Sequence, residues 1–230
     1  MQNFSRNGHG KEGWMCSTIG RKQLIALTGL GLSLFVLIHM AGNLLILVGP
    51  KAYNNYGHNL SSNPLIYAAE AGLVAIFLGH LIIASILSLK NLGARSNRYA
   101  TTATGPKRTT LTQKTLWPQG LLILVFMVLH LITFKYGPEY TVNYGAGEIR
   151  DLHRLVIEIF KMPLYVIWYI VALIVLGFHL SHGIGSLFQT LGLHHVRFQN
   201  AIHRFSVFYA VVVAGGFIVQ PLYVFFIHKG

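Results

Sequence analysis

The stretch LGFHLSHGIGSLFQTLG, from Leu176 to Gly192, begins inside a long apolar run and carries His179 and His182. An imidazole surrounded by hydrocarbon costs roughly several kcal/mol unless another group binds it. Three further apolar runs contain one such histidine each, at His39, His80 and His130. What these residues bind therefore decides how the chain is organised.

The composition is that of a polytopic helical membrane protein, with 53% of the 230 residues hydrophobic and 10% charged. The apolar residues are grouped in long runs, whereas a membrane β-barrel would show short alternating segments. The net charge is +12, but Lys and Arg lie between the apolar runs without a basic face interleaved with aromatics, so no nucleic-acid partner is expected. The single Cys16, without a C-x-x-C-H motif, excludes an internal disulfide and covalently attached haem.

Five apolar runs are predicted to be membrane-spanning helices in one domain, 24–228. They cover about residues 24–48, 65–89, 116–136, 163–188 and 205–228. Residues 1–23 form a polar, basic arm without the apolar core of a signal peptide. Residues 49–64 have the composition of a polar, aromatic loop, and the amphipathic segment 151–161 is expected at the membrane interface.

The distribution of basic residues predicts the orientation. Five spans place the two ends of the chain on opposite sides of the membrane. The N-terminal arm and the connectors 90–115 and 189–204 share one side and hold twelve of the 18 Lys and Arg residues. The N-terminus is therefore expected in the cytoplasm and the C-terminus outside.

Position along each run predicts the depth of each histidine. At 1.5 Å per residue, His39 and His130 lie about 22 and 21 Å from the inner face. His80 and His179, on helices that run inward, stop about 8 and 6 Å short of that face. Two pairs at two levels are the arrangement that two bis-histidine haems b would need, each iron taking one neutral imidazole from each of two helices.

Two further features of such sites are expected. The second ring nitrogen of each ligand should donate to a backbone carbonyl one turn earlier. Small residues should let the macrocycle approach, namely Gly42, Gly79, Gly177 and Ser181, although none stands beside His130. A single histidine in a span is more often a hydrogen bonder or proton relay, and four at matched depths favour ligands. His179 and His182 share one helix face, so the spacing leaves open which of them is the ligand.

Three segments carry a family resemblance: STIGRKQ at Ser17–Gln23, FVLIHMAGN at Phe35–Asn43 and FHLSHGIGSLFQTLG at Phe178–Gly192. They resemble the cytochrome b subunit of succinate dehydrogenase, most closely the single-chain, five-helix, di-haem type shared with some bacterial fumarate reductases. The resemblance extends over nearly the whole chain. It implies an all-α bundle around two haems b in a bacterial cytoplasmic membrane.

In that family the first helix pairs with the third and the second with the fourth. The resemblance thus implies His39 and His130 at the outer haem, and His80 and His179 at the inner haem. It selects His179 over His182 as the ligand. Contacts to haem propionates or to a quinone would then come from a further set of residues, namely His182, Arg21, Ser17, Glu70 and His58. Tyr53 and His153 are weaker candidates. For Glu70, a capping or interfacial carboxylate is favoured over a quinone contact.

The resemblance implies a respiratory electron path with no catalytic residue in this chain. A flavoprotein subunit would oxidise succinate in the tricarboxylic acid cycle, and an iron–sulfur subunit would pass the electrons to this anchor. The haems would carry them to a quinone, usually menaquinone. Basic inner loops suit docking of these subunits or anionic lipid equally well. Some fumarate reductases carry a glutamate two residues before the fourth ligand, but here Gly177 stands there, so no proton path through it is expected.

Two alternatives remain at the level of sequence. The chain could be the haem b subunit of another respiratory oxidoreductase, such as a hydrogenase or formate dehydrogenase, although the FQTLG segment favours the first assignment. It could instead be a histidine-dependent transporter or proton channel. That class typically shows internal repeats and helices broken at the midplane, and the sequence has no clear signal of either.

Overall fold

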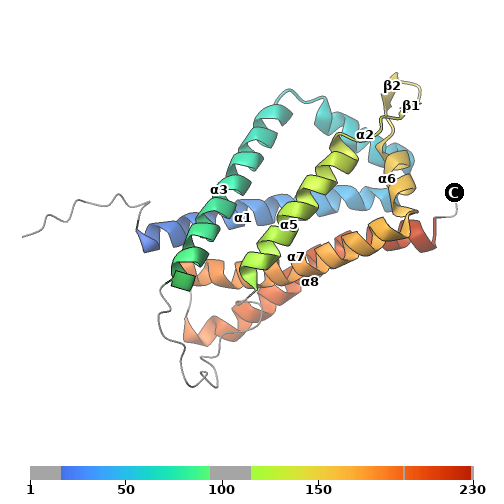
Figure 1. The fold of residues 1–230 in the computed structure, drawn as a ribbon. Coiled ribbons are helices and arrows are strands. Elements are labelled where there is room, and N and C mark those ends of the chain that lie inside the picture. Colours follow the sequence, from blue (N-terminus) through green and yellow to red (C-terminus); the bar gives the residue numbers. More distant parts are fainter. Residues whose placement is uncertain (1–16, 94–114, 194, 229–230) are drawn as a thin grey trace, which may run out of the picture.

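The structure is a computed structural model that describes residues 17–93, 115–193 and 195–228 (Figure 1). Most of the basic arm and of the 90–115 connector lies outside these residues. Within them, five helices are long and apolar enough to cross a membrane. The expectation of a helical, polytopic membrane protein is confirmed at this level.

These five helices have the following bounds. Helix α1 is Thr18–Asn43, continued by the 3-10 turn η2 at Leu44–Leu47; α3 is Ile66–Gly93; α5 is Leu116–His130, continued by the π-helical segment η4 at Leu131–Lys135; α7 is Pro163–Thr190; and α8 is Gln199–Phe226, preceded by the 3-10 turn η5 at Val196–Phe198. Helix α1 packs against α3, α7 and α8, and helix α7 packs against α1, α5 and α8. Helices α1 and α7 therefore each contact three of the other four spans.

Two spans begin about six residues earlier than the apolar runs predict. Helix α1 starts at Thr18 because Ser17 is its N-cap, with the Ser17 Oγ accepting a hydrogen bond from the Gly20 amide at 3.0 Å. Helix α8 starts at Gln199, and its first two residues, Gln199 and Asn200, are polar and exposed. Apolar content marks the part of a helix that can lie in hydrocarbon, whereas caps and backbone bonds set where the helix begins.

The prediction of a loop over 49–64 is wrong, because Pro50–Ser61 forms the helix α2. The chain turns at Gly49, whose φ of 136° favours glycine. Pro50 occupies the first helical position, where an amide N–H would have no partner within the helix. Tyr53 and Asn54 are the buried residues of this short helix. Their burial against other elements, rather than a long apolar run, stabilises α2.

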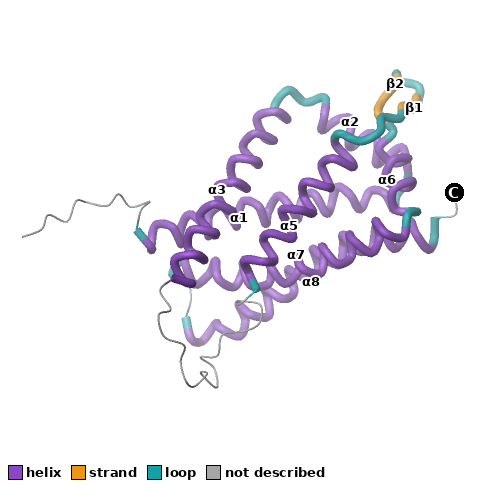
Figure 2. Tube along the Cα trace, viewed as in Figure 1, coloured by secondary structure: helices purple, strands orange, loops and turns teal. Residues whose placement is uncertain are grey.

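A short hairpin and a short helix follow η4. Strands β1 (Thr141–Asn143) and β2 (Glu148–Arg150) pair antiparallel, so the chain is not wholly helical (Figure 2). The amphipathic segment 151–161 forms helix α6 (Leu152–Phe160), and Asp151 is the N-cap of this helix. Its apolar face is buried within the protein itself, with Leu155 only 1% exposed, against α2, α7 and α8.

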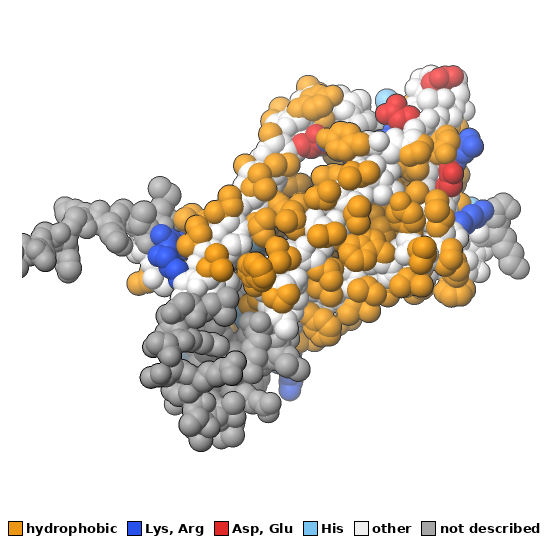
Figure 3. Space-filling view, in the orientation of Figure 1, with side chains coloured by type: hydrophobic (Ala, Val, Ile, Leu, Met, Phe, Trp, Pro, Cys, Tyr) orange, Lys and Arg blue, Asp and Glu red, His pale blue; other side chains and the backbone are white. Residues whose placement is uncertain are grey.

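The two ends of the molecule differ in character. Helices α2 and α6, the hairpin and the C-terminal end of α8 gather at one end, and the start of α1 lies at the other (Figure 1). Between the ends, hydrophobic side chains cover the visible face, and the charged side chains that can be seen lie mostly toward its extremities (Figure 3). Large exposed residues such as Leu164 and Ile167 belong to this apolar surface, as expected of helices in contact with lipid.

Candidate functional site

The four span histidines lie in two pairs. His39 of α1 and His130 of α5 have ring centroids 5.9 Å apart, with their planes at 90°. His80 of α3 and His179 of α7 have ring centroids 6.5 Å apart, with their planes at 73°. These are the two pairs predicted from the depth of each histidine along its apolar run.

The spacing within each pair fits one metal ion held between two imidazoles. A metal–nitrogen distance of about 2 Å on each side puts the two ring centroids about 6 Å apart. All four rings are half-buried, so part of each is accessible to another group. Within the described residues no cluster of three or more His, Cys, Asp or Glu side chains could hold a metal. Two neutral imidazoles per site are the donor set of a bis-histidine haem, which supplies the other four ligands itself.

The second ring nitrogen of two of these histidines has a side-chain partner on a neighbouring helix. His80 Nδ1 lies 3.0 Å from Thr28 Oγ1, and His130 Nδ1 lies 3.1 Å from the Tyr169 hydroxyl. For these two rings the structure gives side-chain partners in place of the backbone carbonyls one turn earlier that the sequence predicts. His179 Nδ1 is buried and has no hydrogen-bond partner among the described residues.

Aromatic rings enclose the outer pair. The nearest phenylalanines are Phe35, Phe126, Phe134 and Phe217. Phe35 stacks on His39 with centroids 5.3 Å apart and planes at 14°. Phe134 lies 5.3 Å from the His130 ring. Such a shell keeps water away from the ring nitrogens and would pack against a planar macrocycle.

A polar chain connects the outer pair to α2. The Tyr53 hydroxyl donates to Asn43 Oδ1 at 2.8 Å, and Asn43 Nδ2 donates to the His39 carbonyl at 2.9 Å. Asn43 Nδ2 also lies 3.4 Å from the His39 ring nitrogens. Burial raises the pKa of Tyr53, so its hydroxyl remains a donor. The sequence placed Tyr53 in a loop, and this contact depends on α2 being a helix.

Two of the glycines near the histidines, Gly42 and Gly177, contact other parts of the protein. A Cβ on Gly42 would lie 2.6 Å from the Tyr56 ring, and one on Gly177 would lie 3.2 Å from the Ala214 side chain. Both glycines therefore serve packing between elements. A Cβ on Gly79 would meet nothing within 4 Å, which leaves that face of α3 open. Gly29, which the sequence analysis did not single out, is the glycine that faces the His80 ring, as a Cβ there would lie 3.3 Å from its Cε1.

The remaining predicted contacts lie at opposite ends of the spans. Ser17 and Arg21 stand in the first turn of α1, where the Arg21 amide donates to the Ser17 carbonyl at 3.1 Å. His182 is half-buried on α7, one turn after His179 toward the C-terminal end of the helix. His58 is exposed on α2 at the other end. The role of these four residues as propionate or quinone contacts stays a prediction.

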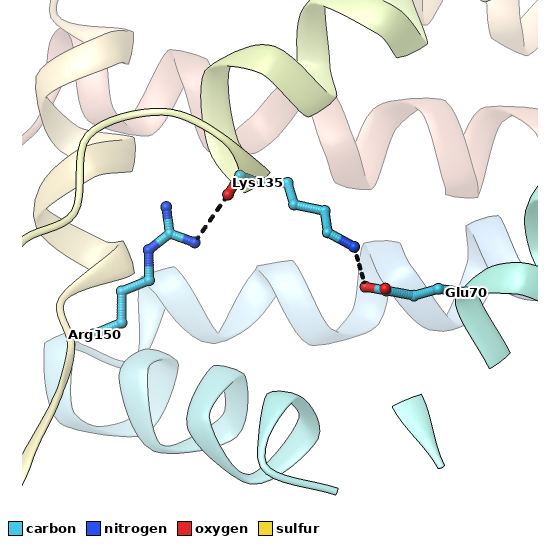
Figure 4. A network of polar contacts seen from close by, with 3 residues as sticks. All are labelled: Glu70, Lys135 and Arg150. Atoms are coloured by element: carbon cyan, nitrogen blue, oxygen red, sulfur yellow. Dashed lines mark hydrogen bonds and ion pairs between the residues drawn. The ribbon is translucent and has the colours of Figure 1, made fainter. Parts of the chain in front are cut away.

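Glu70 has an ionic partner at the α2 end of the molecule. Its Oε1 lies 2.5 Å from Lys135 Nζ in η4, which follows His130 directly (Figure 4). Arg150 donates to the carbonyls of Lys135 at 3.5 Å and Phe134 at 3.0 Å, so it binds the C-terminal end of the same π-helical segment. Both side chains of the ion pair are 39% exposed, so the pair contributes about 1 kcal/mol or less. This contact fits the interpretation of Glu70 as an interfacial carboxylate.

A surface pocket of about 490 Å³ opens at this same end. Its charged and titratable lining residues are Asp151, His153, Arg154, Glu158, Lys161 and His228. The His153 ring lies 6.1 Å from that of Tyr53 and 5.9 Å from that of His228. Burial and then the neighbouring His228 lower the pKa of His153, while Asp151 acts in the opposite direction.

The lowered pKa of His153 predicts that the free energy of unfolding decreases at acid pH. The unfolded chain binds the His153 proton more readily than the folded chain, so the group has no effect above about pH 6.5 and destabilises the fold as the pH falls below that value. His153→Gln should reduce the slope of unfolding free energy against pH in this range. Urea unfolding in detergent between about pH 8 and pH 5 measures it. His203→Gln, at an exposed histidine of α8, is the control, and parallel curves for the wild type and His153→Gln would contradict the prediction.

Comparison of the chain with protein-family models, with curated proteins and with solved structures finds no match. The candidate site consists of two imidazole pairs, His39 with His130 and His80 with His179, carried by helices long enough to span a membrane.

Proposed function

We propose that this chain is the membrane-anchor cytochrome b subunit of a succinate:quinone oxidoreductase, carrying electrons between an iron–sulfur subunit and a membrane quinone. The observation that supports it most is the pairing of His39 with His130 and of His80 with His179 at about 6 Å, within helices of membrane-spanning length. The sequence resemblance adds the type of complex and the presence of a flavoprotein partner.

In this proposal His39 and His130 hold the outer haem, and His80 and His179 hold the inner one. When bound, haem b supplies reversible one-electron transfer. The chain supplies neutral imidazole nitrogens, partners that orient the rings, and a water-poor environment around them. Thr28 and Tyr169 orient His80 and His130 respectively, and the phenylalanines around the outer pair exclude water.

The proposed orientation has the N-terminus in the cytoplasm of a bacterium, so that the iron–sulfur subunit docks at the inner-haem end. The described helices agree with opposite sides for the two ends, since the start of α1 and the end of α8 lie at opposite ends of the molecule (Figure 1). Alkaline phosphatase fused after His228 should be active, because the enzyme folds only outside the cytoplasm. The same reporter fused within the 189–204 connector should be inactive, and the reverse pattern would invert the proposed orientation.

The quinone, expected to be menaquinone, is the substrate of the membrane part in this proposal. His182, Arg21 and Ser17 are candidates for contacts near the inner haem, and Glu70 and His58 near the outer one. Since Glu70 pairs with Lys135, Glu70→Gln and Lys135→Met should change quinone reduction alike if the pair merely stabilises η4. A loss of quinone reduction confined to Glu70→Gln would favour a direct contact with the quinone.

The proposal is tested by isolating the complex. A tag on this chain should co-purify a flavoprotein and an iron–sulfur subunit, and succinate should reduce the haems in that preparation and then a menaquinone analogue. Haem without these two subunits would favour the haem b subunit of another respiratory oxidoreductase. A chain that is folded and functional in transport without haem would favour the transporter or proton channel.

A further inference from the structure

Helix α1 contacts the inner pair although its own histidine belongs to the outer pair. Thr28 Oγ1 lies 3.0 Å from Nδ1 of His80 on α3, 52 residues later in the chain. Thr28 stands eleven residues before His39 on the same helix, which corresponds to about 16 Å along the axis. One helix therefore meets both candidate haem sites, at two different depths.

The direction of this hydrogen bond follows from the other contacts of the hydroxyl. Thr28 Oγ1 lies 2.7 Å from the Leu24 carbonyl and 3.2 Å from the Ile25 carbonyl. A hydroxyl has one proton and carbonyls only accept, so Thr28 donates toward its own helix. Its lone pair is left to accept from His80 Nδ1. The proton of neutral His80 is therefore on Nδ1, and Nε2 is free to bind a metal.

The residue after Thr28 gives the His80 ring the room to make this contact. A Cβ on Gly29 would lie 3.3 Å from His80 Cε1 and 3.8 Å from His80 Nδ1. That is tighter than nearly all real Cβ contacts, so an alanine would push the ring away from α1. Two residues further along the same helix, a Cβ on Gly31 would meet only Ile76 Cδ1, at 4.0 Å. The close approach is thus local to the His80 contact.

The opposite member of the inner pair lacks such a partner. His179 Nδ1 is buried and unpaired within the described part of the chain. An acceptor on Nδ1–H raises the basicity of the other ring nitrogen, and a ring without an acceptor has no such support. The inner pair is therefore unequal, with His80 oriented and the stronger donor, and His179 held by packing.

We propose that Thr28 is the positioning residue of the inner haem: it accepts the Nδ1–H of His80, fixes the tautomer that presents Nε2 to the iron, and strengthens His80 as a ligand. This inference rests on the proposed function. Because a more basic axial ligand favours the oxidised iron, Thr28 lowers the reduction potential of the inner haem relative to a chain without this hydroxyl.

The test uses the complete complex with its partner subunits. Thr28→Val removes the hydroxyl at nearly constant volume, and Thr28→Ser restores it. Redox titration followed by optical and low-temperature EPR spectra should show a higher midpoint potential and a shifted low-spin signal for the inner haem in Thr28→Val only. The outer haem should be unchanged, and His80→Ala identifies which signal is the inner one. Thr133→Val is the control, since Thr133 makes the same bond to its own helix, to the Leu129 carbonyl at 2.7 Å.

Gly29→Ala provides a second route if Thr28→Val accumulates poorly. It should shift the same inner signal, whereas Gly31→Ala should not. Inner-haem signals equal to wild type in both Thr28→Val and Gly29→Ala would overturn the inference, as would an equal shift in Thr28→Val and Thr28→Ser. A wild-type complex without haem would instead overturn the proposed function, so the two failures are distinguishable.

Discussion

His179→Ala is expected to lose the inner haem and keep the outer one, lowering the haem content from two to about one per chain. His179 and His80 form the inner pair, with ring centroids 6.5 Å apart, and removal of one imidazole leaves the iron with a single protein ligand. His182→Ala should keep both haems, because His182 lies one turn beyond the pair. Haem extraction and spectroscopy per mole of chain measure the content.

The outer pair provides the mirror-image control. His130→Ala should lose only the outer haem, whose other ligand is His39 at 5.9 Å between ring centroids. The two single variants should therefore lack different spectral components at the same total haem. Loss of the inner haem from His182→Ala, with retention in His179→Ala, would show that His182 rather than His179 is the ligand on α7.

Asn54→Asp is expected to destabilise the α2 end of the molecule by about 3–5 kcal/mol. Asn54 is 1% exposed, and its Nδ2 donates to Asp151 Oδ1 at 2.8 Å and to the Tyr144 hydroxyl at 3.1 Å. Its Oδ1 accepts from the His153 amide at 2.8 Å. One side chain thus ties α2 to β1–β2 and α6. The substitution removes both donors and places a buried carboxylate against that of the half-buried Asp151.

Urea unfolding in detergent and limited proteolysis of the hairpin measure this loss. Asn59→Asp, on the same helix but exposed, should change the free energy of unfolding by no more than about 0.5 kcal/mol. The loss in Asn54→Asp should shrink as the pH falls toward about 4, because burial beside Asp151 raises the pKa of the new carboxyl and its protonated form can again donate to Asp151. An effect as small as that of Asn59→Asp would mean that these hydrogen bonds do not hold the end of the molecule together.

The spans and the histidine pairs could be predicted because both follow from simple geometry. Long apolar runs have few alternatives to a membrane-spanning helix, and the rise of a helix turns sequence position into depth. The errors in the starts of α1 and α8 have the same origin. A cap such as Ser17 or polar first residues such as Gln199 and Asn200 extend a helix beyond its apolar run, and hydropathy carries no information on that part.

The contacts around the histidines could not be predicted, because they depend on which helix faces which. Thr28 and Tyr169 are ordinary span residues until α3 and α5 are placed beside them. Gly42 and Gly177 stand near ligands in the sequence but face Tyr56 and Ala214 in space. Helix α2 was missed for a related reason, since its stability comes from tertiary burial of Tyr53 and Asn54 rather than from a long periodic pattern.

The haem content of the purified chain tests the central claim most directly. Extraction and quantification of haem b, together with EPR of the oxidised protein, should give two haems per chain, each low-spin with two axial histidines. The signal of each haem should disappear only when a histidine of its own pair is replaced. A folded chain that binds no haem, when produced with its partner subunits and an ample haem supply, would contradict the account.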